Sequence, residues 1–147
     1  MKIYHEIKQG ILSLIAKRTI GARILLVRDN HVLLVKHTYQ NGWYTIGGGV
    51  ESRETPRFAI ERELKEEVGV TLITPPELFA VYYSNREKRD DYIVFYIGRE
   101  CDQKAVKSPE IADSQWFPLE YLPEDTTPAT RRRVDEYLGR REVIELW

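Results

Sequence analysis

Apolar and polar positions alternate along the chain with two different periods, one typical of helices and one typical of strands. Residues 3–17 carry apolar side chains at the spacing of one helix face. The segment 1–17 is therefore predicted to form an amphipathic N-terminal helix. We expect its apolar stripe to pack on the rest of the domain or on a second subunit, because most helical stability comes from such packing.

Strands are predicted where apolar residues cluster between turn signals. The segments with this pattern are 19–27, 31–36, 43–46, 78–83, 92–97 and 115–118. Asp29 and Asn30 form a turn signal between the first two segments, which predicts a hairpin. The polar segments 84–91 and 108–113 are predicted to be loops.

Two later segments are predicted to be helices, 55–68 and 128–138. The first has Thr55 as its N-cap, a proline at the first helical position and Gly69 as its C-terminal cap. Strands and helices are thus mixed along the chain, which favours an α/β fold with a mixed sheet covered on both faces. No linker or repeat divides the chain, so residues 1–147 are predicted to form a single domain.

Charge and cysteine content narrow the classes of function. Lys and Arg total 22 against 23 Asp and Glu, and such a balance argues against a general nucleic-acid or membrane-surface binder. The basic run Arg131–Arg133 spreads around a helix and is interpreted as a solvated helix face. The single cysteine, Cys101, excludes an intrachain disulfide and is typical of a reducing compartment. With no recognisable signal peptide or membrane span, we expect a cytoplasmic protein.

Three carboxylates of the predicted helix 55–68 stand out. Glu63 lies three and four residues before Glu66 and Glu67, so it neighbours both on the helix surface. Like charges at this spacing destabilise a helix, and a bound divalent cation reverses that effect. Oxygen ligands without a nearby cysteine suit Mg²⁺ or Mn²⁺ better than Zn²⁺. The alternative is a solvated acidic patch balanced by basic residues of the same helix.

Three consecutive glycines precede the loop that leads into this helix: Gly47, Gly48 and Gly49. Glycine lets the backbone come close to a ligand and adopt left-handed angles. The alternative is a simple tight turn.

Residues 48–70 resemble the signature of the Nudix hydrolase superfamily, which includes the MutT-like proteins. That signature is Gly, five residues, Glu, seven residues, Arg-Glu, an aliphatic residue, any residue, Glu-Glu, any residue, Gly and an aliphatic residue. Every fixed position and both spacers match in this chain, which reads Gly48, five residues, Glu54, seven residues, Arg62-Glu63, Leu64, Lys65, Glu66-Glu67, Val68, Gly69, Val70.

The resemblance implies an α/β/α sandwich whose loop–helix–loop segment binds Mg²⁺ or Mn²⁺. The ligands that it implies are the carboxylates of the signature, the backbone carbonyl before it and a carboxylate of a later loop, which map onto Glu63, Glu66, Glu67, Gly47 and Glu110. Glu54 and Arg62 resemble the pair that orients the ligating carboxylates. Many members of the family form dimers, and the N-terminal helix is the candidate contact for a homodimer.

The resemblance also implies a reaction. Divalent ions lower the pKa of bound water and orient it for attack on phosphorus, and a carboxylate accepts its proton. Either Glu63 or Glu66 is expected to be that base. Lys36, His37 and Tyr39 precede the glycines and, with Gly48 and Gly49, are the candidates for substrate binding; the alternative for each of the first three is an ordinary surface residue.

The expected substrate is a small nucleotide, either a nucleoside diphosphate derivative or a nucleoside triphosphate. Two other functions stay open. One is a non-catalytic module that senses nucleotides or metabolites, although such modules tend to lose signature carboxylates. The other is removal of diphosphate from RNA 5′ ends, which predicts a basic track for the RNA backbone.

Overall fold

A computed structural model describes residues 3–4, 7, 18–86 and 88–147. Most of the predicted N-terminal helix over 3–17 lies outside the described residues. The described residues of that segment, Ile3, Tyr4 and Ile7, are helical and exposed.

From residue 18 onward, the described chain contains eight strands and two helices. In chain order they are β1 (Arg18–Arg28), β2 (His31–His37), β3 (Ile46–Gly49), α2 (Pro56–Val68), β4 (Val70–Leu72), β5 (Glu77–Ser84), β6 (Asp90–Gly98), β7 (Cys101–Gln103), β8 (Ile111–Pro118) and α3 (Pro128–Tyr137).

The main sheet is mixed and is built around β1, in the order β5-β6-β1-β2-β8. β6 runs parallel to β1 along one edge. The other edge of β1 is shared by two antiparallel partners: β3 pairs with its residues 21–24, and β2 pairs with its last residues through the Val27–Val32 register. The hairpin predicted around Asp29 and Asn30 is confirmed, and both turn residues have positive φ angles.

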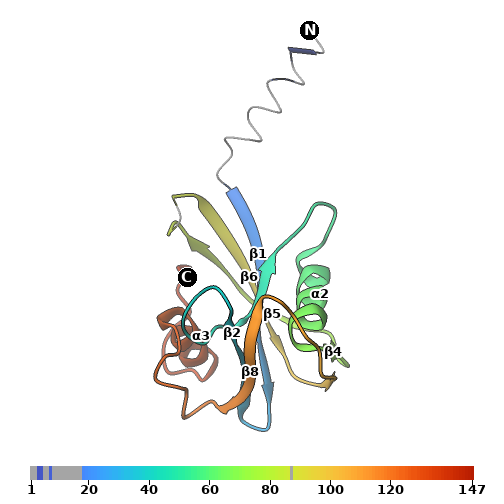
Figure 1. The fold of residues 1–147 in the computed structure, drawn as a ribbon. Coiled ribbons are helices and arrows are strands. Elements are labelled where there is room, and N and C mark those ends of the chain that lie inside the picture. The colour runs from blue at the N-terminus through green and yellow to red at the C-terminus, as the bar shows by residue number, and fades with distance from the viewer. Residues whose placement is uncertain (1–2, 5–6, 8–17, 87) are drawn as a thin grey trace.

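The two helices lie on opposite sides of this sheet (Figure 1). Ile24 of β1 packs in one core cluster with Leu64 of α2, whereas Leu25 packs in a second cluster with Val134 of α3. Successive residues of a strand face opposite sides, so β1 supplies both cores. The predicted α/β sandwich is confirmed.

Local signals set the ends of α2 as predicted. The hydroxyl oxygen of Thr55 accepts a hydrogen bond of 3.1 Å from the backbone N–H of Phe58. Gly69 ends the helix in the left-handed conformation at φ 66°. These caps fix which residues lie on the helix and thereby the positions of its carboxylates.

Some of the predicted strand bounds are wrong, and two short strands were not predicted. The strand predicted over 43–46 begins only at Ile46 and includes the glycines, because β1 pairs with residues 46–49. The segment 108–113, predicted as a loop, already belongs to β8 from Ile111, where it pairs with His37. The short strands β4 and β7 pair with each other and were not predicted, since three residues are too short to show a period.

Packing of α2 on the sheet should determine stability. Replacing Leu64, which is fully buried, with alanine removes methyl groups from a packed core and should lower the free energy of unfolding by about 2–5 kcal/mol. Phe58→Ala on the same helix is the matched control, because that ring is 58% exposed, and it should cost about 0.5 kcal/mol. Urea denaturation measures both; equal losses would contradict this packing.

Candidate active site

Two glycines of β3 lie against neighbouring elements where a side chain would not fit. A Cβ atom on Gly48 would lie 2.5 Å from a carboxylate oxygen of Glu63, so no other residue fits there without moving that carboxylate. A Cβ atom on Gly47 would lie 2.2 Å from the carbonyl oxygen of Ala22. Gly48 therefore lets the Glu63 carboxylate lie directly against the β3 backbone, and Gly47 lets β3 lie close to β1.

Arg62 holds this region together through its guanidinium group. It donates two hydrogen bonds to the Glu54 carboxylate, at 2.7 and 2.9 Å, and a third of 3.0 Å to Glu63. It also donates to the carbonyl oxygen of Gly49 at 3.2 Å. The hydrogen bonds from Arg62 hold the pKa of Glu54 below its ordinary value. A bidentate pair of this kind fixes orientation as well as charge, so Arg62 ties the loop before α2 to the helix and to β3.

Glu67 is the most buried carboxylate of the helix, with 6% of its surface exposed. Burial, followed by the neighbouring carboxylate of Glu63, raises the pKa of Glu67 to about 8. One of its oxygens, Oε2, is buried and has no hydrogen-bond partner within the described part of the chain. A buried acceptor without a partner is unfavourable, and a cation between Glu63 and Glu67 would satisfy it.

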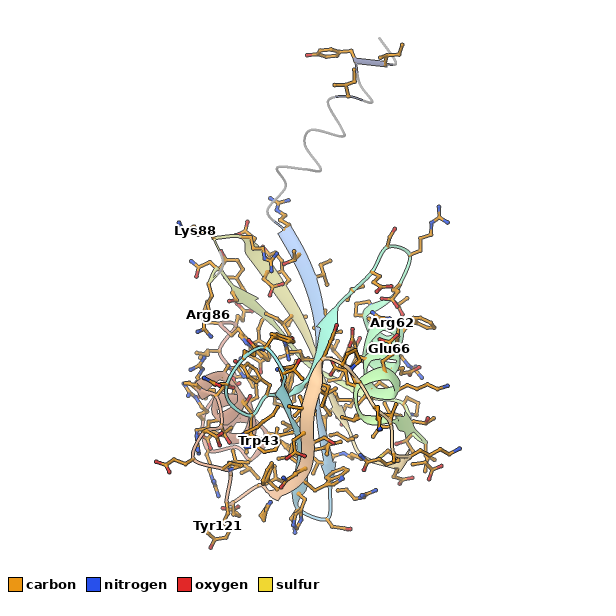
Figure 2. The ribbon with its side chains drawn as sticks, viewed as in Figure 1. Trp43, Arg62, Glu66, Arg86, Lys88 and Tyr121 are labelled. Atoms are coloured by element: carbon orange, nitrogen blue, oxygen red, sulfur yellow. The ribbon has the colours of Figure 1, made fainter. Side chains whose placement is uncertain are left out.

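Glu66 lies apart from this buried pair. Its side chain is 60% exposed, and its closest cation is Arg62 at 3.4 Å. Figure 2 shows Arg62 and Glu66 together on α2. As they stand, the described residues contain no group of three acidic, histidine or cysteine side chains that could hold a metal ion. Glu63 and Glu67 are therefore brought together, whereas Glu66 lies at the edge.

The predicted residue Glu110 lies beside the end of β2, directly before β8. Its backbone carbonyl accepts a hydrogen bond of 2.9 Å from the N–H of Thr38, which joins the end of β2 to the start of β8. The negative charge of its carboxylate favours the protonated forms of Glu67, His37 and Tyr39 and so contributes to their pKa values. The β2–β8 pairing thus brings a carboxylate from far along the chain to α2.

His37 and Tyr39 lie next to each other beside Glu110. Their ring centroids are 5.0 Å apart, and Tyr44 lies 4.9 Å from the other side of His37. His37 is buried and Tyr39 is 67% exposed. Burial, followed by the nearby Arg23, lowers the pKa of His37.

Lys36 lies on the other face of the sheet. Its ammonium group forms an ion pair of 2.9 Å with Asp125 and lies 5.1 Å from the centre of the Trp43 ring. Trp43 belongs to the core cluster on the α3 side, across the sheet from Arg62 and Glu66 (Figure 2). His37 instead contacts Tyr44, which packs against the core cluster on the α2 side, so Lys36 and His37 lie on opposite sides of the sheet.

Arg23 is a charged residue near the site that sequence reasoning missed. It lies in β1 between apolar residues, and Glu67 is the acidic group that acts on it most strongly. Burial lowers its pKa. The signal in the sequence was an arginine inside an otherwise apolar strand, which requires a reason for a charge at that position.

A family model for the NUDIX domain matches residues 17–138. The chain belongs to the Nudix hydrolase family. The matched region includes the glycines of β3, the whole of α2 and Glu110, so this Nudix domain contains every candidate site residue described above.

The Nudix domain is similar to several proteins with different names. It is 30% identical to the nucleoside triphosphatase NudI of Escherichia coli O139:H28, over 75% of this chain and 89% of NudI. It is 27% identical to an RNA pyrophosphohydrolase of Zymomonas mobilis, over 69% of this chain and 79% of that protein. It is also 30% identical to the NAD-capped RNA hydrolase NudC of Pseudomonas aeruginosa, over 80% of this chain but only 43% of NudC.

A solved structure supports the fold of the Nudix domain. The MutT NUDIX hydrolase of Burkholderia pseudomallei superposes with a TM-score of 0.71 and 26% identity, covering 80% of this chain and 96% of the other. In the described part of the chain, no helix has the length and apolar character needed to cross a membrane.

The buried carboxyl group of Glu67 predicts a pH dependence of stability without metal. The folded protein retains the Glu67 proton up to about pH 8, whereas the unfolded chain releases it near the ordinary value of 4.5. The folded state therefore binds more protons within this window, so stability falls as pH rises through it. Glu67→Gln stays neutral and lacks this fall. Thermal unfolding in EDTA should show the variant gaining on wild type by a few kcal/mol between pH 5 and 8.5; parallel curves would contradict the burial of this carboxyl group.

Proposed function

We propose that this Nudix domain is an Mg²⁺- or Mn²⁺-dependent pyrophosphohydrolase that cleaves the diphosphate linkage of a nucleoside triphosphate or a nucleoside diphosphate derivative. The observation that carries the proposal is the carboxylate pair of Glu63, which lies against Gly48 of β3, and the buried Glu67. One buried oxygen of Glu67 has no partner within the described chain. Two carboxylates in this arrangement favour a divalent cation over further protein contacts.

The metal would be held by Glu63 and Glu67, joined by Glu66, Glu110 and the carbonyl of Gly47. Glu66 can bind the metal only if it leaves Arg62. The ion pair between Glu66 and Arg62 is weak, because it is exposed and its atoms are 3.4 Å apart. When bound, the metal supplies a water of lowered pKa and neutralises charge on the phosphate groups.

The chain's own residues supply orientation and a base. Arg62 holds Glu54 and Glu63 in fixed positions, so the Glu63 carboxylate does not have to reorganise when substrate arrives. Either Glu63 or Glu66 accepts the water proton in our proposal. Glu66 has the more exposed carboxylate, which gives it easier exchange of the proton with solvent.

The relatives support a nucleotide substrate. NudI, whose name describes a nucleoside triphosphatase, is matched over 89% of its length. Small nucleotides need only a few local cations and no extended basic surface, in agreement with the near-neutral net charge of this chain.

Hydrolysis of RNA 5′ ends is the second candidate, because several relatives are named RNA pyrophosphohydrolases. The run Arg131–Arg133 does not supply the basic track that this function predicts. Arg133 is fully buried beside Glu136, and Arg131 and Arg132 donate to the backbone carbonyls of Pro123 and Trp147. These contacts favour the small-nucleotide substrate.

A panel of substrates tests this proposal. Nucleoside triphosphates, nucleotide sugars, ADP-ribose, dinucleoside polyphosphates and 5′-triphosphorylated RNA are incubated with Mg²⁺ or Mn²⁺, and products are separated by chromatography. We expect metal-dependent cleavage of a small nucleotide that EDTA abolishes. Cleavage confined to RNA would support the second candidate. Binding without any product would favour the non-catalytic sensing module.

Variants of the carboxylates test the site. Glu63→Gln and Glu67→Gln remove one ligand charge each and should lower kcat about a hundredfold or more, with the fold retained. The matched control is Glu61→Gln on the same helix, because Glu61 is paired with Arg57 at 3.0 Å and is not one of the candidate ligands. Steady-state rates and circular dichroism measure the outcome. Turnover near that of wild type in both site variants would contradict the assignment.

A further inference from the structure

A cavity of about 550 Å³ lies beside the buried side chain of Glu67, and we call it the loop cavity. Its walls are the end of α2, the segment 103–108 and the first residues of β8. Ligand cavities in proteins commonly span about 300–1,000 Å³, so the loop cavity has room for a bound group. Because Glu67 lines the cavity and also belongs to the proposed metal site, the cavity and that site share a wall.

Contacts with the end of α2 fix the segment that forms one wall of the loop cavity. The backbone N–H of Lys104 donates a hydrogen bond of 2.9 Å to the carbonyl oxygen of Gly69. The side-chain amide of Gln103 donates another, of 3.3 Å, to the carbonyl oxygen of Val68. A Cβ atom on Gly69 would collide with the carbonyl oxygen of Lys104, so only glycine allows this approach. Direct contacts therefore set the position of Lys104 relative to the helix that carries the carboxylates.

Two lysines, Lys104 and Lys107, supply the positive charge of the loop cavity. Both are exposed, and neither ammonium group forms an ion pair or a hydrogen bond with the described residues. The acidic residues of the lining are Glu67 and Asp113, and the Asp113 carboxylate accepts a hydrogen bond of 2.7 Å from Gln115. An ammonium group has three N–H donors, so both lysines can bind an anion that enters the cavity.

The remaining lining favours phosphate over a nucleobase. It contains Ser108 and Ser114, which carry hydroxyl groups, and none of the described residues that line the cavity is aromatic. Nucleobases bind to proteins largely by stacking on aromatic rings, whereas phosphate groups accept hydrogen bonds from ammonium and hydroxyl groups. The loop cavity therefore matches the phosphate end of a nucleotide rather than its base.

We propose that Lys104 and Lys107 bind the terminal phosphate of a nucleoside triphosphate, which reaches from the metal site into the loop cavity. This inference rests on the proposed function and narrows its substrate to the triphosphate class. A triphosphate has a third anionic group beyond a diphosphate, whereas a nucleotide sugar has a neutral sugar in that place. Lysine suits this position because its ammonium group is a compact charge that binds phosphate oxygens without a fixed geometry.

Analogues that cannot be hydrolysed test this site separately from turnover. Methylenediphosphonate and bis(methylene)triphosphonate have carbon bridges in place of the bridging oxygens, and each is titrated into the full chain with Mg²⁺ by calorimetry. Wild type should bind the triphosphonate about 10-fold more tightly than the diphosphonate, because charge-assisted hydrogen bonds to the lysines are added. The double variant Lys104→Gln/Lys107→Gln should lose this advantage. The matched control Lys65→Gln/Lys88→Gln removes two exposed lysines that do not line the loop cavity and should keep it.

The other outcomes separate the phosphate site from the proposed hydrolase. Equal affinity of wild type for the two phosphonates, or no binding of either, overturns the site. An advantage that survives in the cavity variant also overturns it, as does an equal loss in the control, which would show a general effect of charge. If the phosphonates bind as expected but nothing on the substrate panel is hydrolysed, the hydrolase fails and the phosphate site stands. Hydrolysis confined to nucleotide sugars or ADP-ribose keeps the hydrolase and overturns the triphosphate class.

Discussion

The carboxyl group of Glu67 is buried next to the carboxylate of Glu63, one turn away on the same helix. Both the low dielectric of the interior and the neighbouring negative charge oppose its ionisation, and one of its oxygens has no partner in the described chain. A folded protein keeps such a group buried only when other interactions outweigh the unfavourable free energy of its burial. Here those interactions are the apolar contacts of α2 with the sheet, which determine where the helix places both carboxylates.

The remaining features of the site follow from this constraint. Gly48 of β3 lets the Glu63 carboxylate reach the strand backbone, and Arg62 holds Glu63 in one orientation by donating to Glu54 as well. A site whose ligands are oriented before the metal arrives loses little energy on reorganisation. The Arg62 guanidinium is engaged by protein groups, because it donates to Glu54, to Glu63 and to the carbonyl oxygen of Gly49.

Much of this arrangement can be predicted from the sequence because it depends on helix caps and helical spacing, which are local. Thr55, the following proline and Gly69 define the ends of α2 within one helical turn, and helical spacing then places Glu63 beside Glu67. The features that sequence reasoning missed depend on strand register. Arg23 gains its position only because β1 pairs with Gly47, and β8 begins earlier than predicted because Ile111 pairs with the end of β2. A shift of one residue in either register would turn those side chains to the other face. Lys36 and His37 lie on opposite sides of the sheet, but the pairing of β2 with β8 is irregular between them, so strand alternation alone does not predict this.

The most direct test of the central claim is a diffraction experiment on crystals soaked in Mn²⁺, with data recorded at the manganese absorption edge. Our proposal predicts an anomalous peak within bonding distance of carboxylate oxygens of both Glu63 and Glu67, and its loss in crystals of Glu67→Gln. A Mn²⁺ peak bound only by other residues, or none in a well-ordered crystal, would show that the buried carboxylate pair does not form a metal site.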